Sequence, residues 1–149
     1  MEQGGMCMKN NQEKKYLDNW LSITNIQMGI TNELESALQK NHNLSLKEFY
    51  VLYFLSKTSD KQLRLQQLQE MVGLSQSAIS RLVVRLEAKS CGVLQRQTCE
   101  DDRRGIYTRL TTLGEEKLQI SLNTVHEILH SAFSKGNLQE ELQSLIEKL

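Results

Sequence analysis

The chain has 149 residues, a length that suits one domain of ordinary size and excludes most large two-domain enzymes. Lys and Arg together number 18, as do Asp and Glu, so the formal charge is zero and indicates no class of partner. With 39% hydrophobic and 24% charged residues, the composition excludes a disordered chain, and the lack of proline favours a mostly helical one.

Nothing in the sequence indicates a membrane or secreted protein. The longest apolar run, Val51 to Leu55, has five residues, whereas a membrane span requires roughly 18. The first residues lead into a polar stretch without the apolar core of a signal peptide, so we expect a cytoplasmic protein. Cys7, Cys91 and Cys99 are odd in number and lack CxxC spacing, which predicts free thiols rather than disulfides or a structural zinc site.

Charge is distributed unevenly along the chain. The net charge is 0 over residues 1–63, +3 over 64–110 and −3 over 111–149. All seven arginines lie in the middle segment: Arg64, Arg81, Arg85, Arg96, Arg103, Arg104 and Arg109. Because a guanidinium group suits bidentate contacts to phosphates and guanine edges, this segment is predicted to form a nucleic-acid face. The alternative is that the arginines simply cluster on solvated helix faces.

Helical periodicity dominates the first half of the chain. From about residue 13 to 39, apolar residues recur over more than one stripe, which predicts a long helix whose second face meets another helix or subunit. The segment from Ser45 to Glu48 has the capping-box pattern and opens a helix that extends to about Lys57. A short helix follows over about 65–72 and stops at Gly73.

A glycine-bearing turn, Gly73 to Ser75, separates that short helix from a polar one over about 75–90. A short helix, a tight turn and a polar helix form a helix-turn-helix, whose second helix enters the major groove of DNA. Small hydroxyl side chains allow close approach, glutamine can pair with adenine, and arginine can reach guanine or phosphate. The predicted contacting residues of this helix are Ser75, Gln76, Ser77, Ser80, Arg81 and Arg85.

In the second half of the chain, the spacing of apolar residues changes from the helical period to a period of two residues. Two β-prone runs, 93–97 and 106–110, are joined by a charged segment and predict a hairpin, or wing, over about 92–110. A second capping-box pattern, Thr112 to Glu115, opens a long helix, and a cap at Asn137 opens the last one.

The wing sequence makes the motif more specific. The run Asp102-Arg103-Arg104-Gly105, followed by Leu110-Thr111 at the step into a long helix, resembles the MarR family of bacterial transcription regulators, as does the helix order over nearly the whole chain. The resemblance implies a mostly α fold with a small β-hairpin wing. A winged helix-turn-helix over about 44–111 would be flanked by dimerisation helices over about 13–39 and 112–149.

The same resemblance implies a function and a role for the wing. It implies a homodimer that presents two winged lobes to a pseudo-palindromic operator in double-stranded DNA, most often as a ligand-responsive repressor. Arg104 would enter the minor groove, with Arg103 beside it and Asp102 orienting it. If the family resemblance is set aside, a solvated turn is an equally good interpretation of these residues.

Members of the family often bind a small phenolic or lipophilic effector, which nothing in this sequence identifies. His126 and His130 lie four residues apart and could join a third ligand such as His42 in a metal site, although surface or interface histidines are the simpler interpretation. Cys7, with Tyr16 nearby, partly matches the reactive cysteine of peroxide-sensing relatives, but a tail preceding the first helix would not activate it. We therefore expect no cofactor.

The sequence argues against two other classes of function. A winged-helix protein-interaction module without specific DNA binding is the alternative, but such a module has no need of Arg103 and Arg104 at its tip. No phosphate-binding glycine loop, HExxH or GxSxG motif occurs, so the chain is predicted not to be an enzyme.

Overall fold

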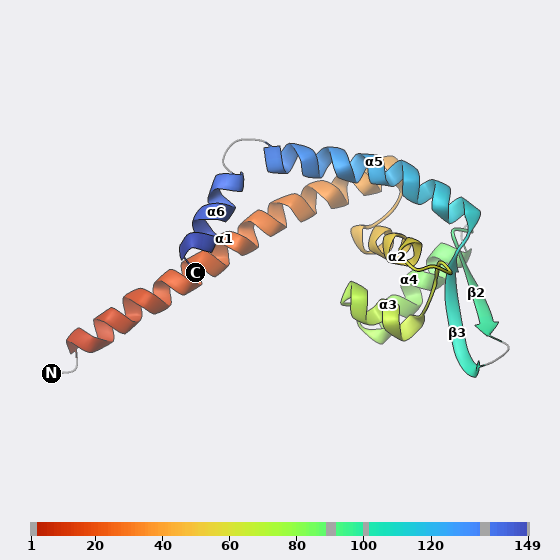
Figure 1. The fold of residues 1–149 in the computed structure, drawn as a ribbon, viewed down its shortest axis with the longest axis horizontal. Helices are drawn as coiled ribbons and strands as arrows, with labels where there is room; N and C mark the ends of the chain where they lie inside the picture. Colours follow the sequence, from red (N-terminus) through yellow and green to blue (C-terminus); the bar gives the residue numbers. More distant parts are fainter. Residues whose placement is uncertain (1–2, 89–91, 100–101, 135–137, 149) are drawn as a thin grey trace. The chain divides into compact units, whose positions relative to one another are not determined.

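The computed structural model describes residues 3–88, 92–99, 102–134 and 138–148. For residues 3–9, 88, 99, 102–104, 139 and 148 it describes the backbone alone. The elements, in chain order (Figure 1), are α1 (Gln3–His42), α2 (Leu46–Ser56), β1 (Gln62–Arg64), α3 (Leu65–Val72), α4 (Gln76–Ala88), β2 (Leu94–Cys99), β3 (Asp102–Leu110), α5 (Thr112–Ser134) and α6 (Leu138–Lys148). The predicted fold class, mostly α with a small β-hairpin wing, is confirmed.

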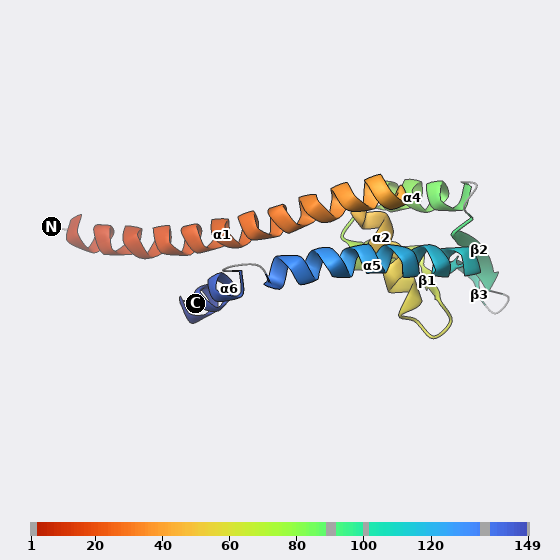
Figure 2. The same ribbon diagram turned by 90° about the horizontal axis from the view of Figure 1, so that it is seen from above.

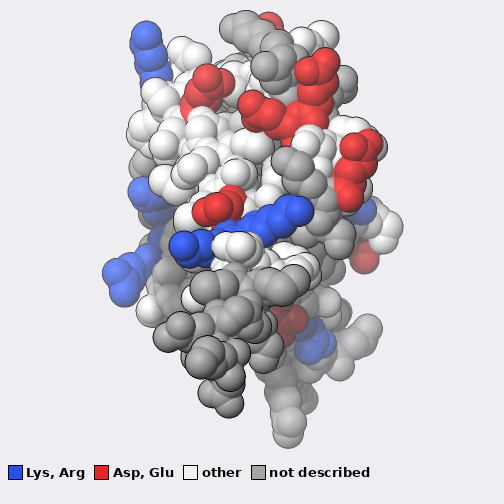
Figure 3. Space-filling model, turned by 90° about the vertical axis from the view of Figure 1, so that its left-hand side faces the viewer, with Lys and Arg blue, Asp and Glu red and all other residues white. Residues whose placement is uncertain are grey.

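The chain divides into two compact units. The first comprises Met1–Leu34 and His126–Leu149, and the second comprises Glu35–Val125. Both α1 and α5 contribute residues to each unit. None of the helices in the described part of the chain combines the length and the apolar character that a membrane crossing requires. The face drawn in Figure 3 carries Lys and Arg side chains among Asp, Glu and uncharged ones.

In the first unit, α1 is longer than its apolar pattern predicts. It begins at Gln3 rather than at about residue 13, so the predicted start was wrong and Cys7 lies within the helix rather than before it. The added residues contain two adjacent glycines and no repeating apolar stripe, and periodicity cannot detect a helix that lacks such a stripe. The predicted cap of α6 at Asn137 lies outside the described residues.

The second unit contains the three helices that the sequence places around the turn. At the start of α2, the Ser45 hydroxyl accepts a hydrogen bond from the Glu48 amide (3.0 Å), and Glu48 Oε1 accepts one from the Ser45 amide (2.9 Å), which confirms the capping box. Helix α3 packs against both α2 and α4. Their fully buried side chains form one apolar core with neighbouring segments: Leu38, Leu44, Val51, Leu52, Leu55, Leu68, Ile79, Val83 and Val93.

The sheet of this unit is antiparallel, with strand order β1-β3-β2. Strands β2 and β3 run side by side as the predicted hairpin in both ribbon views (Figures 1 and 2). The three-residue strand β1 was not predicted, and it pairs Gln62 with Arg109 and Arg64 with Tyr107. It attaches the segment before α3 to the wing.

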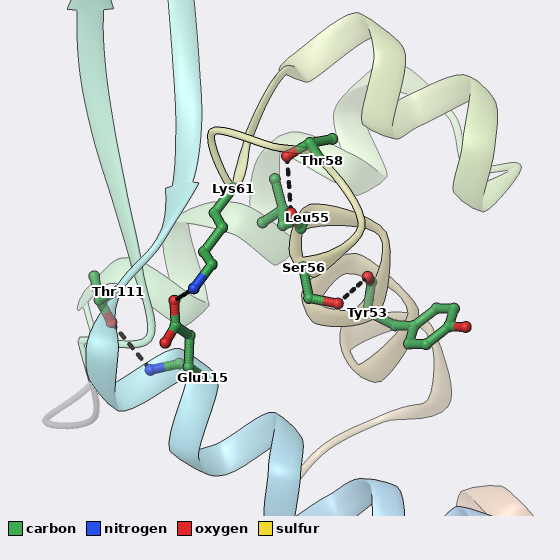
Figure 4. Close-up of polar contacts among 8 residues, drawn as sticks. Tyr53, Leu55, Ser56, Thr58, Lys61, Thr111 and Glu115 are labelled. Carbon is green, nitrogen blue, oxygen red and sulfur yellow. Dashed lines mark hydrogen bonds and ion pairs between the residues drawn. The ribbon is translucent and has the colours of Figure 1, made fainter.

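The start of α5 corrects a second expectation. The capping residue is Thr111 rather than Thr112, because its hydroxyl accepts the hydrogen bond of the Gly114 amide (3.1 Å; Figure 4). The Glu115 carboxylate does not complete the predicted capping box but forms an ion pair with Lys61. The first turn of α5 is therefore joined to the segment that precedes β1.

Candidate nucleic-acid interface

The turn before α4 sets the position of that helix. Gly73 ends α3 in the left-handed conformation (φ 74°), and its amide donates to the Gln69 carbonyl (2.9 Å). Two residues later the Ser75 hydroxyl accepts a hydrogen bond from the Ala78 amide (3.2 Å), so Ser75 caps α4 as predicted. The capped turn presents the first turn of α4 to solvent.

Helix α4 has two distinct faces. Its apolar face is buried against the core through Ile79, Leu82, Val83 and Leu86. The predicted contact residues lie largely on the other side, where Ser80 is partly exposed and the others are exposed: Ser75, Gln76, Ser77, Arg81 and Arg85. Short hydroxyl side chains and two guanidinium groups on one exposed face can donate hydrogen bonds to phosphates and to base edges in a DNA groove.

The orientation of this helix is held by the first turn of α2. Glu48, whose side chain is 3% exposed, forms an ion pair with Arg85 through Oε1 (2.6 Å to a guanidinium nitrogen). Its other oxygen, Oε2, is buried with no hydrogen-bond partner among the described residues. Beside it, the Lys47 ammonium donates to the Val72 carbonyl at the end of α3 (2.9 Å). One turn of α2 thus contacts both helices of the helix-turn-helix.

Other arginines of the predicted nucleic-acid face also have protein partners. Arg96 on β2 donates from Nε to Glu87 on α4 (2.8 Å), which joins the wing to that helix. Arg64 donates from Nε to the Tyr107 hydroxyl (3.2 Å) and lies 5.4 Å from the centre of that ring. Sequence reasoning missed these pairings, because each partner lies on a different element and the pair forms only when the two elements pack together.

At the tip of the wing the strand register shifts. Thr98 lies opposite Ile106, whereas the next residue, Cys99, lies opposite Asp102. Arg103 and Arg104 therefore fall in a bulged part of β3, and a bulge changes the direction in which side chains project. The side chains of Asp102, Arg103 and Arg104 lie outside the described part of the structure, so the predicted contact between Asp102 and Arg104 stays a prediction.

The candidate sensor residues form no metal site among the described residues. His130 contacts the Ser134 hydroxyl through Nδ1 (3.2 Å), and among the described residues there is no group of three or more His, Cys, Asp or Glu side chains suited to a metal ion. The Cys7 side chain lies outside that part of the structure. His42 contacts the Thr124 hydroxyl through Nε2 (2.6 Å), and burial, together with the charge of Lys117, lowers the pKa of His42.

The lowered pKa of His42 predicts a dependence of stability on pH. Because folding disfavours the protonated imidazole, the free energy of unfolding should decrease as the pH falls below about 6.5, where the unfolded chain begins to take up the proton. Urea unfolding of the wild type and of a His42→Gln variant at pH 7.5 and 5.5 measures this. The prediction would be contradicted if, between pH 7.5 and 5.5, the wild type lost no more unfolding free energy than the variant.

Comparisons with known proteins agree with this geometry. A family model described as transcriptional regulator SarA/Rot matches residues 33–121. The HTH-type transcriptional regulator SarZ of Staphylococcus epidermidis is 30% identical over 116 residues, 74% of each chain. The transcriptional repressor MprA of Escherichia coli is 27% identical over 125 residues, 78% of this chain and 70% of its own.

A solved structure is similar as well. Sco3205, a MarR family transcriptional regulator from Streptomyces coelicolor whose crystal structure is in complex with DNA, superposes with a TM-score of 0.73 at 26% identity. The match covers 86% of this chain and 79% of the other.

Proposed function

Because this chain belongs to the SarA/Rot family of transcriptional regulators and has the fold of MarR family regulators, we propose that it is a homodimeric repressor of a pseudo-palindromic operator. The predicted resemblance to the MarR family is confirmed. The relatives of this chain are transcriptional regulators rather than enzymes. The observation that carries the proposal is the exposed polar and basic face of α4, held by a capped turn.

We assign separate tasks to the helix and the wing. In the proposed complex, α4 lies in the major groove, where Ser75, Gln76, Ser77, Ser80 and Arg81 face base edges. Arg85 is already paired with Glu48, so its role is to hold α4 in place and to contact the phosphate backbone. The wing enters the minor groove with Arg104, and Arg103 contacts phosphate. Repression requires only that the bound protein blocks the promoter.

The first experiment is fluorescence anisotropy of the purified protein with DNA from upstream of its own gene and with a scrambled duplex, each at two salt concentrations. Tight binding to the first duplex alone, decreasing steeply with salt, is the expected result. Equally weak binding to both, and to duplexes selected from a random library, would contradict the proposal and favour a protein-interaction module.

Removing the wing arginine should weaken binding in a salt-dependent way. Arg104→Ala is expected to reduce operator affinity and to lower the slope of log affinity against log salt by about 2, because the dimer carries Arg104 twice and two fewer counterions are released. Arg104→Lys is the control, since it keeps the charge and loses the planar fork; it should keep the slope. An unchanged slope in the alanine variant would show that Arg104 does not contact the DNA.

The proposed dimer is supported by the first unit. Large apolar side chains remain exposed along the N-terminal half of α1: Tyr16, Leu17, Trp20, Leu21 and Ile23. Trp20 is 63% exposed in the single chain, which is unusual for the largest apolar side chain in a protein. A contiguous apolar stripe of this kind marks an interaction surface, and a second copy of the helix is a complementary partner for it.

Trp20→Glu is expected to dissociate the dimer. Two-fold symmetry places the change in the interface twice, and at roughly 2 kcal/mol for each buried aromatic side chain the dissociation constant should rise at least about 100-fold. Light scattering coupled to gel filtration measures the mass. Asn11→Glu adds the same charge nine residues earlier, on the opposite side of α1, and should stay dimeric. A dimeric Trp20→Glu would contradict this assignment.

The response to an effector remains part of the proposal. A groove of about 620 Å³ between the end of α1 and the start of α5 is lined by apolar Val93, Leu113 and Ile120. Its charged lining residues are two lysines, Lys40 and Lys117, and one carboxylate, Glu116. Apolar walls with a few charged groups fit a small aromatic carboxylate. Titration of the operator complex with such acids should release DNA, and release that persists in a Lys117→Met variant would exclude this groove.

A further inference from the structure

One apolar side chain lies on the otherwise polar face of α4. Val84 is 47% exposed. Among the described side chains of this helix, no other large hydrophobic side chain is exposed. It follows Ser77 and Arg81 at spacings of seven and three residues, so the three lie on one stripe. The buried residues of α4 lie on the opposite side, so Val84 sits near the middle of the exposed face.

The surroundings of Val84 form a small, shallow hollow. It has a volume of about 310 Å³ and is lined by Ser80, Arg81, Val84 and Arg85. The ion pair with buried Glu48 restrains the Arg85 side of the hollow. Ser80 leaves space on its own side, because its side chain is short. An apolar floor is thus bordered by a hydroxyl and two guanidinium groups.

This chemistry matches one feature of the major groove. Of the four base-pair orientations, only those containing thymine present a methyl group there, beside hydrogen-bond acceptors and a donor. An exposed apolar side chain flanked by donors is complementary to that edge. The flanking donors also argue against an apolar protein segment as the occupant, because it would leave the Arg81 guanidinium without an acceptor.

We infer that Val84 is a specificity-determining residue that contacts the C5-methyl group of a thymine in each half of the operator, with Arg81 reaching the adjacent base pair. The inference rests on the proposed function, since it requires α4 to lie in the major groove. It adds a residue that the sequence did not single out, and it specifies which base that residue recognises.

The test removes the methyl group from the DNA and the valine from the protein. A duplex is first selected from a random-sequence library by the wild-type protein, and each thymine is then replaced in turn by deoxyuridine, which lacks only the methyl group. At one thymine of each half-site the wild type should lose about fourfold in affinity, the value of one buried carbon group. Val84→Ala should bind the unmodified duplex more weakly and show no further loss at that position.

Two controls separate this contact from general effects. Ile106→Ala truncates another exposed apolar residue, on the wing, and should retain the full deoxyuridine effect. Val84→Ala is expected to melt near the wild-type temperature, because the side chain is half exposed. Sequence-selective binding that is insensitive to every deoxyuridine, or equally sensitive in Val84→Ala, would overturn the inference and leave the proposed function standing. Failure to select any sequence would overturn both.

Discussion

Gly114→Ala is expected to lower the free energy of unfolding by about 3 kcal/mol, the upper end of the range for overpacking a filled site. Gly114 is buried in the first turn of α5. A Cβ atom at this position would overlap the carbonyl oxygen of Val93 and the side chain of Leu110. One of these obstacles is backbone, which cannot rotate away as a flexible side chain can.

The surrounding hydrogen bonds keep that backbone in place. The Val93 carbonyl accepts from the Thr111 amide (3.1 Å), and the Gly92 carbonyl accepts from the Thr111 hydroxyl (2.6 Å). Moving Val93 away from a new Cβ would break the junction between the start of the wing and the cap of α5. Operator affinity should therefore fall together with stability, because the wing would lose its support.

Urea unfolding followed by circular dichroism measures the change. Gly29→Ala provides a matched control, because Gly29 lies inside α1 and a Cβ there meets nothing within 4 Å. The control should be neutral or more stable by up to about 1 kcal/mol, the difference in helix propensity. Equal effects of the two substitutions would show that the Val93 carbonyl does not exclude a Cβ atom at position 114.

Arg85→Met is expected to have an effect of similar size, a loss of about 3 kcal/mol in unfolding free energy. The substitution leaves the Glu48 carboxylate buried with only its capping contact to Ser45, and Oε2 already has no partner among the described residues. The value lies at the low end for breaking a buried ion pair, because the Arg85 side chain is 49% exposed and water reaches it. Operator affinity should also decrease, since α4 loses its tie to α2.

The control for Arg85 is on the same helix. Arg81→Met removes an equally charged, exposed side chain and should change stability by less than about 0.5 kcal/mol. The double variant Glu48→Leu, Arg85→Met should recover part of the loss, because no buried charge remains. If Arg85→Met is as stable as Arg81→Met, the ion pair with Glu48 does not hold α4 in position.

Local rules were enough to predict most of the elements. The caps at Ser45 and Ser75, the end of the short helix at Gly73 and the period-two runs of the wing depend on residues within a few positions of one another. Their physics is local, so their sequence signatures are reliable. The same rules misplaced the cap of α5, because Thr111 and Thr112 are both acceptable caps and the choice depends on hydrogen bonds from Thr111 to the Gly92–Val93 segment.

Strand β1 shows the limit of pattern reading. Three residues are too few to show a period, and Gln62 to Arg64 become a strand only because β3 offers an unpaired edge. The close approach at Gly114 likewise has no local signature. Both features arise from segments that are separated by many residues and meet only in the folded chain.

The sequence by itself determined the class of the protein: the helix-turn-helix, the wing, the concentration of arginines and the family they resemble. Only the tertiary structure decided which protein groups Arg85 and Arg96 contact. It paired Arg85 with Glu48 and Arg96 with Glu87, and it left Val84 exposed beside Arg81. The physical reason is that charge and hydrophobicity are properties of single residues, whereas pairing and exposure depend on which distant elements come within a few ångströms.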